Sequence, residues 1–297
     1  ISPTGSGKSL MIYAITRYHT EYKRSTLIIV PTTSLVEQMY KDFIDYSWDA
    51  DTYCHKIYAG KDLLSEKQVI ISTWQSIYKL PKTWFNRFDV VIGDEAHQFK
   101  SKSLVSIMTK LYDTKYRYGF TGTLDGTQTH KWVLEGLFGP SYKIINTKEL
   151  QEKGYLATLN IKVLLLKHDP IKFDTYQDEI EYLIGHEKRN KFIRNLAWDL
   201  KGNTLLLYSR VATHGEVLYD IINKVERKVF FVHGGVDVEE RESVRRITEE
   251  EDNAIIIASF GTFSTGINIK NLHNVIFASP SKSRIRTLQS IGRVLRK

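Results

Sequence analysis

Short runs of apolar or aromatic residues recur through the first half of the chain, and a polar motif follows each of them. The runs are residues 26–31, 69–72, 89–93 and 116–120. Apolar runs of this length are typical of parallel strands that are buried on both faces. Between the first two, residues 34–46 place Leu35, Met39 and Phe43 at helical spacing, with Ser34 as the expected N-cap. This alternation predicts an open parallel α/β sheet with its site along the carboxyl edge.

The pattern changes near residue 150 and then resumes. Residues 148–154 predict a short helix with a glycine stop and residues 158–167 a long strand, and residues 176–200 are predicted to be helical and charge-rich. Strands and helices then alternate over residues 204–208, 211–224, 228–232, 237–249, 254–258 and 274–278, before an apolar-periodic segment at 284–297. We therefore expect two similar α/β lobes in tandem, over residues 1–150 and 151–297, with the boundary placed to within about ten residues.

Composition narrows the class of protein. At 297 residues the chain can form two domains with separate cores. Its formal net charge of +8 favours a polyanionic partner. The single cysteine, Cys54, excludes an internal disulfide or a cysteine-rich metal site and fits a reducing compartment. Neither a membrane-length apolar run nor a signal peptide is visible, so we expect a cytoplasmic protein without a membrane partner.

The opening stretch SPTGSGKS has the form of a phosphate-binding loop before a helix. Gly5 and Gly7 lack Cβ atoms, so successive backbone N–H groups can close around a phosphate. Lys8 would bridge the β- and γ-phosphates of a nucleotide, and the Ser9 hydroxyl would hold Mg²⁺. The residues predicted to line the nucleotide are Thr4, Gly5, Ser6, Gly7, Lys8 and Ser9. Ser2 stands where the pattern usually has its first glycine, and the alternative is a glycine-rich turn before a helix.

Asp94 and Glu95 form the acidic pair that a phosphate-binding loop requires. They follow the apolar run 89–93 and precede Ala-His. Asp94 would hold Mg²⁺, and Glu95 would orient and activate the attacking water. A solvated acidic loop is the alternative for such a pair alone, but together with Lys8 the pair predicts nucleotide hydrolysis.

The motifs in order resemble those of superfamily 2 helicases of the DEAH-box type, over nearly the whole chain. They are SPTGSGKS, IIVPTTSLVEQ, ISTWQS, VVIGDEAH, FTGTL, LLLYSR, VHGG, ASFGTFSTGIN and QSIGRVLRK. The PTT, TWQ, FSTGI and IGRVLRK strings are also similar to those of the UvsW-like recombination and repair helicases of T4-type phages. The resemblance implies two RecA-like lobes, ATP in the cleft between them, and nucleic acid across both.

The same resemblance implies further roles. His97 and the pair Thr121 and Thr123 would couple hydrolysis to movement. Gly266 and Asn268 would contact nucleotide and nucleic acid from the second lobe, although many relatives have Asp in place of Asn268. The residues that would face the γ-phosphate across the cleft are Gln289, Arg293 and Arg296. Their i, i+4 and i+7 spacing puts all three on one helical face, for which a solvated basic face is the alternative.

Several polar residues directly after strands are candidate contacts to nucleic-acid phosphates. They are Pro31, Thr32, Thr73, Gln75, Ser209, Arg210, Gly234 and Thr265. Hydroxyl and free N–H groups at such positions can bind the backbone without reading sequence. Each could equally be a turn residue or a helix cap. The basic stretch at 282–286 is interpreted as a solvated face, and no histidine other than His97 is assigned a role.

The sequence begins at Ile1, whereas a phosphate-binding loop should follow a strand, so we expect this to be a piece of a longer protein. The predicted function is an ATP- and Mg²⁺-dependent DNA helicase or branch-migrating translocase, in the bacterial host cell if phage-encoded. A restriction-type DNA translocase motor and an RNA helicase remain open. A nucleic-acid clamp without turnover is disfavoured by intact Lys8, Glu95 and Arg293.

Overall fold

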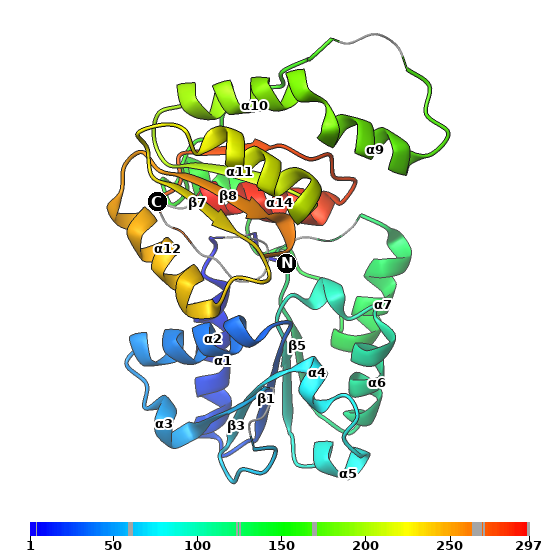
Figure 1. The fold of residues 1–297 in the computed structure, drawn as a ribbon. Helices are drawn as coiled ribbons and strands as arrows, with labels where there is room; N and C mark the ends of the chain where they lie inside the picture. The colour runs from blue at the N-terminus through cyan, green and yellow to red at the C-terminus, as the bar shows by residue number, and fades with distance from the viewer. Residues whose placement is uncertain are drawn as a thin grey trace. The chain divides into compact units, whose positions relative to one another are not determined.

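The computed structural model describes residues 1–3, 5–58, 62–122, 124, 126–167, 171–262, 269 and 271–295; the side chains of Val238 and Arg293 lie outside this description. The chain forms two compact units, Ile1–Leu150 and Gln151–Lys297 (Figure 1). Across the described ranges, none of the helices combines the length and apolar character needed to cross a bilayer.

The first unit is built on a five-stranded parallel sheet. Its strands are β1 (Thr26–Val30), β2 (Cys54–Ile57), β3 (Val69–Thr73), β4 (Val90–Gly93) and β5 (Tyr116–Gly119). They lie in the order β2-β3-β1-β4-β5, and every neighbouring pair is parallel. All residues of β1 and β3 are buried, as expected for inner strands covered on both faces.

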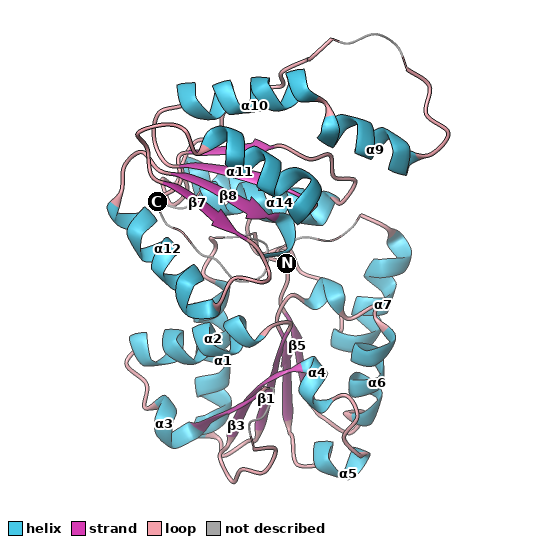
Figure 2. Cartoon of the chain, viewed as in Figure 1, coloured by secondary structure: helices cyan, strands magenta, loops and turns pink. Residues whose placement is uncertain are grey.

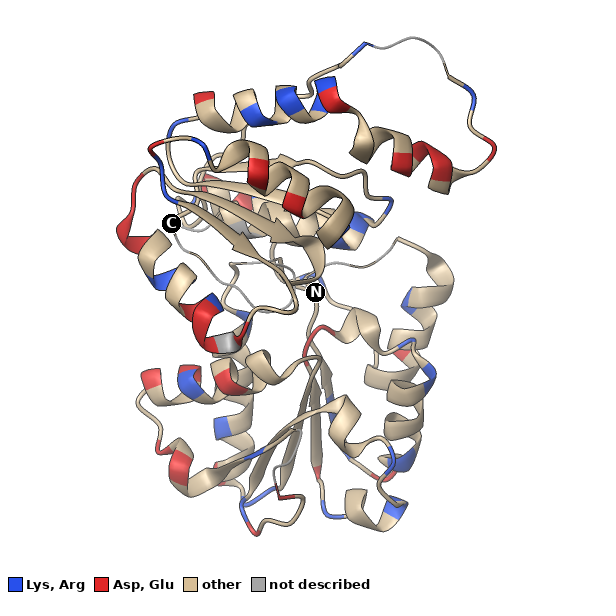
Figure 3. Ribbon diagram, viewed as in Figure 1, with Lys and Arg blue, Asp and Glu red and all other residues tan. Residues whose placement is uncertain are grey.

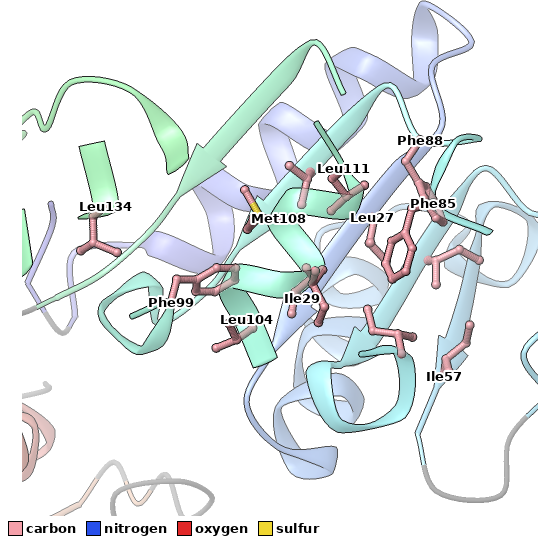
Figure 4. Close-up of a cluster of buried hydrophobic side chains, with 14 residues drawn as sticks. Leu27, Ile29, Ile57, Phe85, Phe88, Phe99, Leu104, Met108, Leu111 and Leu134 are labelled. Atoms are coloured by element: carbon pink, nitrogen blue, oxygen red, sulfur yellow. The ribbon is translucent and has the colours of Figure 1, made fainter. Parts of the chain in front are cut away.

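Helices cover both faces of this sheet (Figure 2). The helical segments of this unit are α1 (Lys8–Glu21), α2 (Thr33–Asp45), α3 (Ala50–Tyr53), α4 (Trp74–Ile77), α5 (Lys82–Phe85), the 3₁₀ turn η1 (Ala96–Gln98), α6 (Lys102–Lys110) and α7 (Gln128–Phe138). The helix α8 (Thr147–Glu152) includes residues of both units. Alternate residues of β1 point to opposite cores. Leu27 and Ile29 pack with residues of α5, α6 and α7 (Figure 4), whereas Ile28 and Val30 pack with residues of α1 and α2. The two cores fix the carboxyl ends of β1, β4 and β5 as one edge.

The second unit has a four-stranded parallel sheet in the order β7-β8-β6-β9. Its strands are β6 (Thr204–Tyr208), β7 (Val229–Val232), β8 (Ile255–Ser259) and β9 (Asn274–Phe277). Its helices are α9 (Tyr176–Gly185), α10 (Glu187–Asp199), the π-helical turn η2 (Val211–Gly215), α11 (Glu216–Ile222), α12 (Val238–Glu250) and α14 (Arg284–Val294). One core packs against α10 and α11, and the other includes residues of α12 and α14. The prediction of two parallel α/β units is therefore confirmed.

The strand predicted over residues 158–167 is wrong. This segment forms no strand, and Ile161, Val163 and Leu165 are between 71% and 86% exposed. A hollow of about 2020 Å³ is lined both by this segment and by β9. A β-branched, alternating sequence favours a strand only where a neighbouring strand is there to pair with it.

The helical range predicted over residues 176–200 is confirmed, and it consists of two helices, α9 and α10. Thr175 and Asp178 form a capping box that begins α9. The chain then leaves helical geometry at His186, whose Nδ1 accepts from the backbone N–H of Arg189 at 3.1 Å and caps α10. A histidine cap at this position interrupts a pattern that apolar spacing alone would continue.

Candidate active site

The loop before α1 has the geometry of an anion cradle. Gly5 and Gly7 have φ values of 79° and 80°, in the left-handed region that glycine tolerates. A Cβ atom at Gly7 would meet nothing within 4 Å, so the glycine is needed for its backbone angle and not for space. The Lys8 ammonium donates to the carbonyl oxygens of Ser2 and Pro3, at 3.2 Å each. Lys8 also begins α1, whose N-terminus carries the positive end of the helix dipole.

One hydrogen bond joins this loop to the sheet edge, and another lies within the loop. The backbone N–H of Ser2 donates to the carbonyl oxygen of Thr121, just after β5, at 2.9 Å. The Ser6 hydroxyl donates to a carbonyl oxygen within the loop, that of Pro3, at 2.6 Å. Ser9 is the second residue of α1, and Thr4 lies outside the described residues.

Asp94 and Glu95 follow β4 directly, so the structure places both at the carboxyl edge beside the loop. The backbone N–H of Asp94 donates to the carbonyl oxygen of Ile29, at 3.0 Å. Burial, followed by the neighbouring Glu95 carboxylate, raises the pKa of Asp94, whereas Lys8 and His97 act in the opposite direction. Glu95 itself has φ 49° and ψ 47°, a left-handed conformation that costs a non-glycine residue free energy and concentrates at functional sites.

His97 connects the carboxylate pair to the segment after β5. Its Nδ1 lies 3.2 Å from Oε2 of Glu95 and 3.1 Å from Oγ1 of Thr121. Both His97 and Thr121 are buried. His97 thus contacts two other residues predicted to belong to the chemistry, Glu95 and Thr121. Thr123 lies outside the described residues.

His130 also belongs to this cluster, although its sequence position alone predicts no role for it. Its Nε2 lies 2.9 Å from the carbonyl oxygen of His97, and the side chain is 4% exposed. Thr127 caps the helix that carries it, α7. The sequence does hold a signal, since His130 lies four residues before Leu134, on the buried face of an amphipathic helix. A histidine among core positions needs a polar partner inside the fold.

The donors at this edge fit a magnesium nucleotide. A carboxylate at Asp94 and a hydroxyl at Ser9 are hard oxygen ligands, and Mg²⁺ is commonly held by one or two such groups together with substrate phosphates. Among the residues the structure describes, no group of three or more His, Cys, Asp or Glu side chains could hold a metal by protein ligands alone. A cation would also offset the burial of the Asp94 carboxylate.

The PTT and TWQ segments meet at the same edge. The Gln75 side-chain amide donates to the carbonyl oxygen of Pro31, at 3.1 Å. Pro31, Trp74 and Asp94 line one narrow cleft. Gln75 is exposed and Pro31 is buried, so the pair joins a surface amide to the strand end beneath it.

Two hydroxyl groups predicted to contact phosphates have local partners. The Thr32 side chain accepts from the N–H of Leu35, at 3.3 Å, and caps α2. The cap expected at Ser34 is therefore wrong, because the N-cap lies two residues earlier, at Thr32. Thr73 is 4% exposed, and its Oγ1 lies 2.9 Å from Oγ of Ser76.

In the second unit, Ser209 and Arg210 follow β6. The Ser209 N–H donates to Oγ of Ser279, at 3.0 Å, and the Arg210 guanidinium lies 3.3 Å from a carboxylate oxygen of Glu181 on α9. Gly234 is exposed after β7. The strand ends of this unit therefore present polar groups as the sequence analysis expected.

The remaining predicted residues lie on or beyond α14. Gln289 is half-buried on that helix, and Arg293 belongs to its backbone. Gly292, between them, is buried. Besides Thr4 and Thr123, the predicted residues outside the described part of the chain are Thr265, Gly266, Asn268, Arg296 and the Arg293 side chain.

A parallel α/β unit with a lysine-bearing glycine loop and an acidic pair at neighbouring strand ends defines a P-loop nucleotide-binding protein, here followed by a second parallel α/β unit. The family described as "Type III restriction enzyme, res subunit" matches residues 1–126, and "Helicase conserved C-terminal domain" matches residues 187–297. Most of the chain is therefore similar to these two families, through residues 1–126 and 187–297.

Two individual relatives are described as a DNA helicase and a DNA translocase. The chain is 39% identical to the ATP-dependent DNA helicase uvsW of Enterobacteria phage T4, over 99% of this chain and 61% of that protein. It is 26% identical to the DNA 3'-5' translocase XPB2 of Sulfurisphaera tokodaii, over 100% of this chain and 74% of that protein. The solved structure of the ATP-dependent Type ISP restriction-modification enzyme LlaBIII bound to DNA shares the fold, with a TM-score of 0.67, 16% identity, and coverage of 100% of this chain and 25% of that chain. The chain thus spans about three fifths of the length of uvsW.

Proposed function

We propose that this chain is the motor of an ATP-dependent DNA helicase or branch-migrating translocase. The observation that carries the proposal is the joined edge of the first unit. There the loop that holds Lys8 is bonded to Thr121, and Thr121 in turn contacts His97 beside Glu95. An anion cradle, an acidic pair and a buried link between them are the parts that nucleotide hydrolysis coupled to movement requires.

Each residue at this edge has a proposed task. Lys8 neutralises phosphate charge, while the backbone N–H groups of residues 4–7 surround it. Ser9 and Asp94 hold Mg²⁺. Glu95 orients the attacking water and accepts its proton. Bound ATP with Mg²⁺ would supply the phosphoanhydride bond whose hydrolysis releases the energy for movement.

The tasks proposed for other residues follow the family resemblance. Coupling of ATP hydrolysis to movement is proposed for His97, Thr121 and Thr123. Gly266 and Asn268 contact nucleotide and nucleic acid. A role in turnover is proposed for Gln289, Arg293 and Arg296. The backbone of the nucleic acid is proposed to contact Pro31, Thr32, Thr73, Gln75, Ser209, Arg210, Gly234 and Thr265. Contacts of this kind carry no sequence code, which a translocase needs.

ATP hydrolysis by the purified chain, measured with and without DNA, tests the proposal. We expect stimulation by unrelated DNA sequences that declines steeply as salt rises, because phosphate contacts release counterions. Lys8→Ala should abolish nucleotide binding, whereas Glu95→Gln should retain binding and lower turnover about 100-fold or more. An ATP hydrolysis rate that DNA does not change, or that Glu95→Gln does not lower, contradicts the proposal.

Two related motors are the alternatives. A restriction-type DNA translocase is one alternative, because the family that matches residues 1–126 is described as a subunit of a restriction enzyme. An RNA helicase is the other, because a putative ATP-dependent RNA helicase of Acanthamoeba polyphaga mimivirus is 26% identical to this chain. Replacing DNA by RNA of the same sequence in the hydrolysis assay separates a DNA motor from an RNA helicase. A clamp without turnover would bind nucleic acid in an ATP-dependent manner and release no phosphate.

A further inference from the structure

The second unit contains a buried chain of hydrogen bonds that the proposed chemistry does not use. Nδ1 of His214 lies 2.8 Å from Oγ of Ser279, and its Nε2 lies 3.3 Å from Oδ1 of Asn190. The three side chains are 0%, 2% and 4% exposed. They come from η2, from the segment after β9 and from α10, so the chain of bonds crosses three separate elements.

The direction of every bond in this chain is determined. The Asn190 Nδ2 group donates to the carbonyl oxygen of Ile184, at 2.7 Å, so its Oδ1 faces His214 as an acceptor. Nε2 of His214 must then carry the proton, which leaves Nδ1 to accept from the Ser279 hydroxyl. A lone pair on Ser279 Oγ is thereby available to the backbone N–H of Ser209, which donates to it at 3.0 Å.

Backbone geometry turns His214 inward. The N–H of Gly215 donates to the carbonyl oxygen of Arg210, at 2.9 Å, which closes a π-helical turn in place of the first α-helical turn. A Cβ atom on Gly215 would lie 2.5 Å from the ring of Tyr208, so only glycine permits this turn against β6. Single π turns are uncommon and occur often at functional sites.

We propose that His214 is a positioning residue that fixes the loop of Ser209 and Arg210 relative to the segment after β9. Neutral His214 orients the Ser279 hydroxyl, and that hydroxyl holds the Ser209 amide. The Ser209 hydroxyl and the Arg210 guanidinium then project from a backbone of fixed geometry. The inference rests on the proposed function, in which these two residues contact nucleic-acid phosphates.

Two substitutions of His214 separate positioning from simple core packing. An asparagine amide can place an acceptor where Nδ1 stands, whereas a glutamine amide reaches the position of Nε2. His214→Asn should therefore preserve the bond to Ser279, and His214→Gln should lose it while keeping the bond to Asn190. Ser279→Ala removes the hydroxyl and should reproduce the effect of His214→Gln.

The first measurement is hydrogen exchange of the Ser209 amide, followed by NMR on the full chain. Exchange should be about tenfold faster in His214→Gln and Ser279→Ala than in His214→Asn, since one hydrogen bond is lost. The second is affinity for a mixed-sequence DNA oligonucleotide. It should weaken about tenfold in the first two variants and less than threefold in His214→Asn. Nucleotide affinity, measured alongside, should not change.

Thermal melting of all variants supplies the control for packing. If DNA affinity follows melting temperature without regard to the acceptor at position 214, or Ser209 exchange is the same in Asn and Gln variants, positioning by His214 is wrong. If the unsubstituted chain binds no nucleic acid, the proposed function fails. In that case a clear difference in Ser209 exchange still supports the positioning of the loop, and equal exchange overturns it.

Discussion

Nδ1 of His97 lies 3.1 Å from Oγ1 of Thr121, although 24 residues separate them in the chain. The carbonyl group of Thr121 also accepts the backbone N–H of Ser2, at 2.9 Å. One threonine therefore touches the phosphate-binding loop through its backbone and the acidic segment through its side chain. A movement of the phosphate-binding loop therefore changes the contacts of the acidic segment, and a movement of the acidic segment changes those of the loop.

Thr121→Val keeps the shape of the threonine but removes its hydroxyl. We expect nucleic-acid-stimulated ATP hydrolysis to fall about tenfold, because a buried hydrogen bond to His97 is lost. Nucleotide affinity should change little, since the contact with the loop is made by the backbone. Thr121→Ser is the matched control and should retain most of the stimulation. Equal loss in both variants would assign the effect to packing.

Gly119 is a second tight contact beneath the site. A Cβ atom there would lie 2.9 Å from the ring of Phe138 and 3.2 Å from Cβ of Ala96. Gly119→Ala should lower the free energy of unfolding by about 1–3 kcal/mol, through overpacking. Gly136→Ala is the control, because its Cβ would meet nothing within 4 Å and should stabilise α7 by about 0.5–1 kcal/mol. Urea denaturation of both variants measures the difference.

Shortening the opposing side chain should rescue the first of these variants. Phe138→Leu combined with Gly119→Ala should cost less than the sum of the two single changes, since the clash is relieved in the double variant. Strict additivity would show that the ring of Phe138 is not what excludes a side chain at Gly119.

Inner strands were predictable because burial on both faces leaves an uninterrupted apolar run. The edge strand β2 was not, since only Cys54 and Ile57 are buried and the two residues between them are partly exposed. The sequence of a short strand with two polar positions cannot be distinguished from that of a loop. For residues 158–167 the sequence predicted a strand that is not formed, because a strand-like pattern does not supply a partner strand.

The motif residues of the first unit were predictable for a related reason. Parallel strands end at one edge, so residues directly after each run must meet there. The roles of His130 and His214 were not predicted, because their hydrogen-bond partners come from distant elements. His214 shares its buried helical face with Leu218 and Ile222, which marks it as a core position. Its bond to Ser279, 65 residues away, follows from tertiary packing alone.

His214 also makes the stability of the second unit depend on pH. Burial, and secondarily the Arg189 guanidinium on α10 that faces it, lower the pKa of His214 to about 4. In the unfolded chain an ordinary histidine titrates near 6.5. As pH falls below about 6.5, His214 becomes protonated in the unfolded state but stays neutral in the folded state. The free energy of unfolding therefore decreases until the pH reaches the folded-state pKa of about 4. The free energy of unfolding should fall by about 2 kcal/mol between about pH 7 and about pH 5.

His214→Asn is the control for this pH dependence, because it lacks a titratable group at that position. The difference in unfolding free energy between the two chains should shrink as the solution is acidified. Denaturant titrations at several pH values, followed by a probe in the second unit, give that difference. A difference that stays constant with pH would mean that His214 is protonated in the folded state as readily as in the unfolded one.

The last prediction concerns Glu181, whose carboxylate lies 3.3 Å from the guanidinium of Arg210. Figure 3 shows that acidic residues lie along α9, the helix that contacts η2 beside this loop. In the proposed function Arg210 binds a nucleic-acid phosphate, so Glu181 competes with that phosphate for the same guanidinium. The two side chains are 32% and 57% exposed, so the ion pair itself contributes little to stability. Glu181→Gln should therefore leave thermal stability unchanged and raise affinity for DNA about two- to fivefold at low salt.

Glu179→Gln is the control, because it removes an equal charge from the same helix without touching Arg210. We expect it to raise DNA affinity less, by the amount that the change in net charge alone produces. If both variants gain equally, the carboxylate acts through net charge alone; if neither gains, Arg210 does not contact the phosphate.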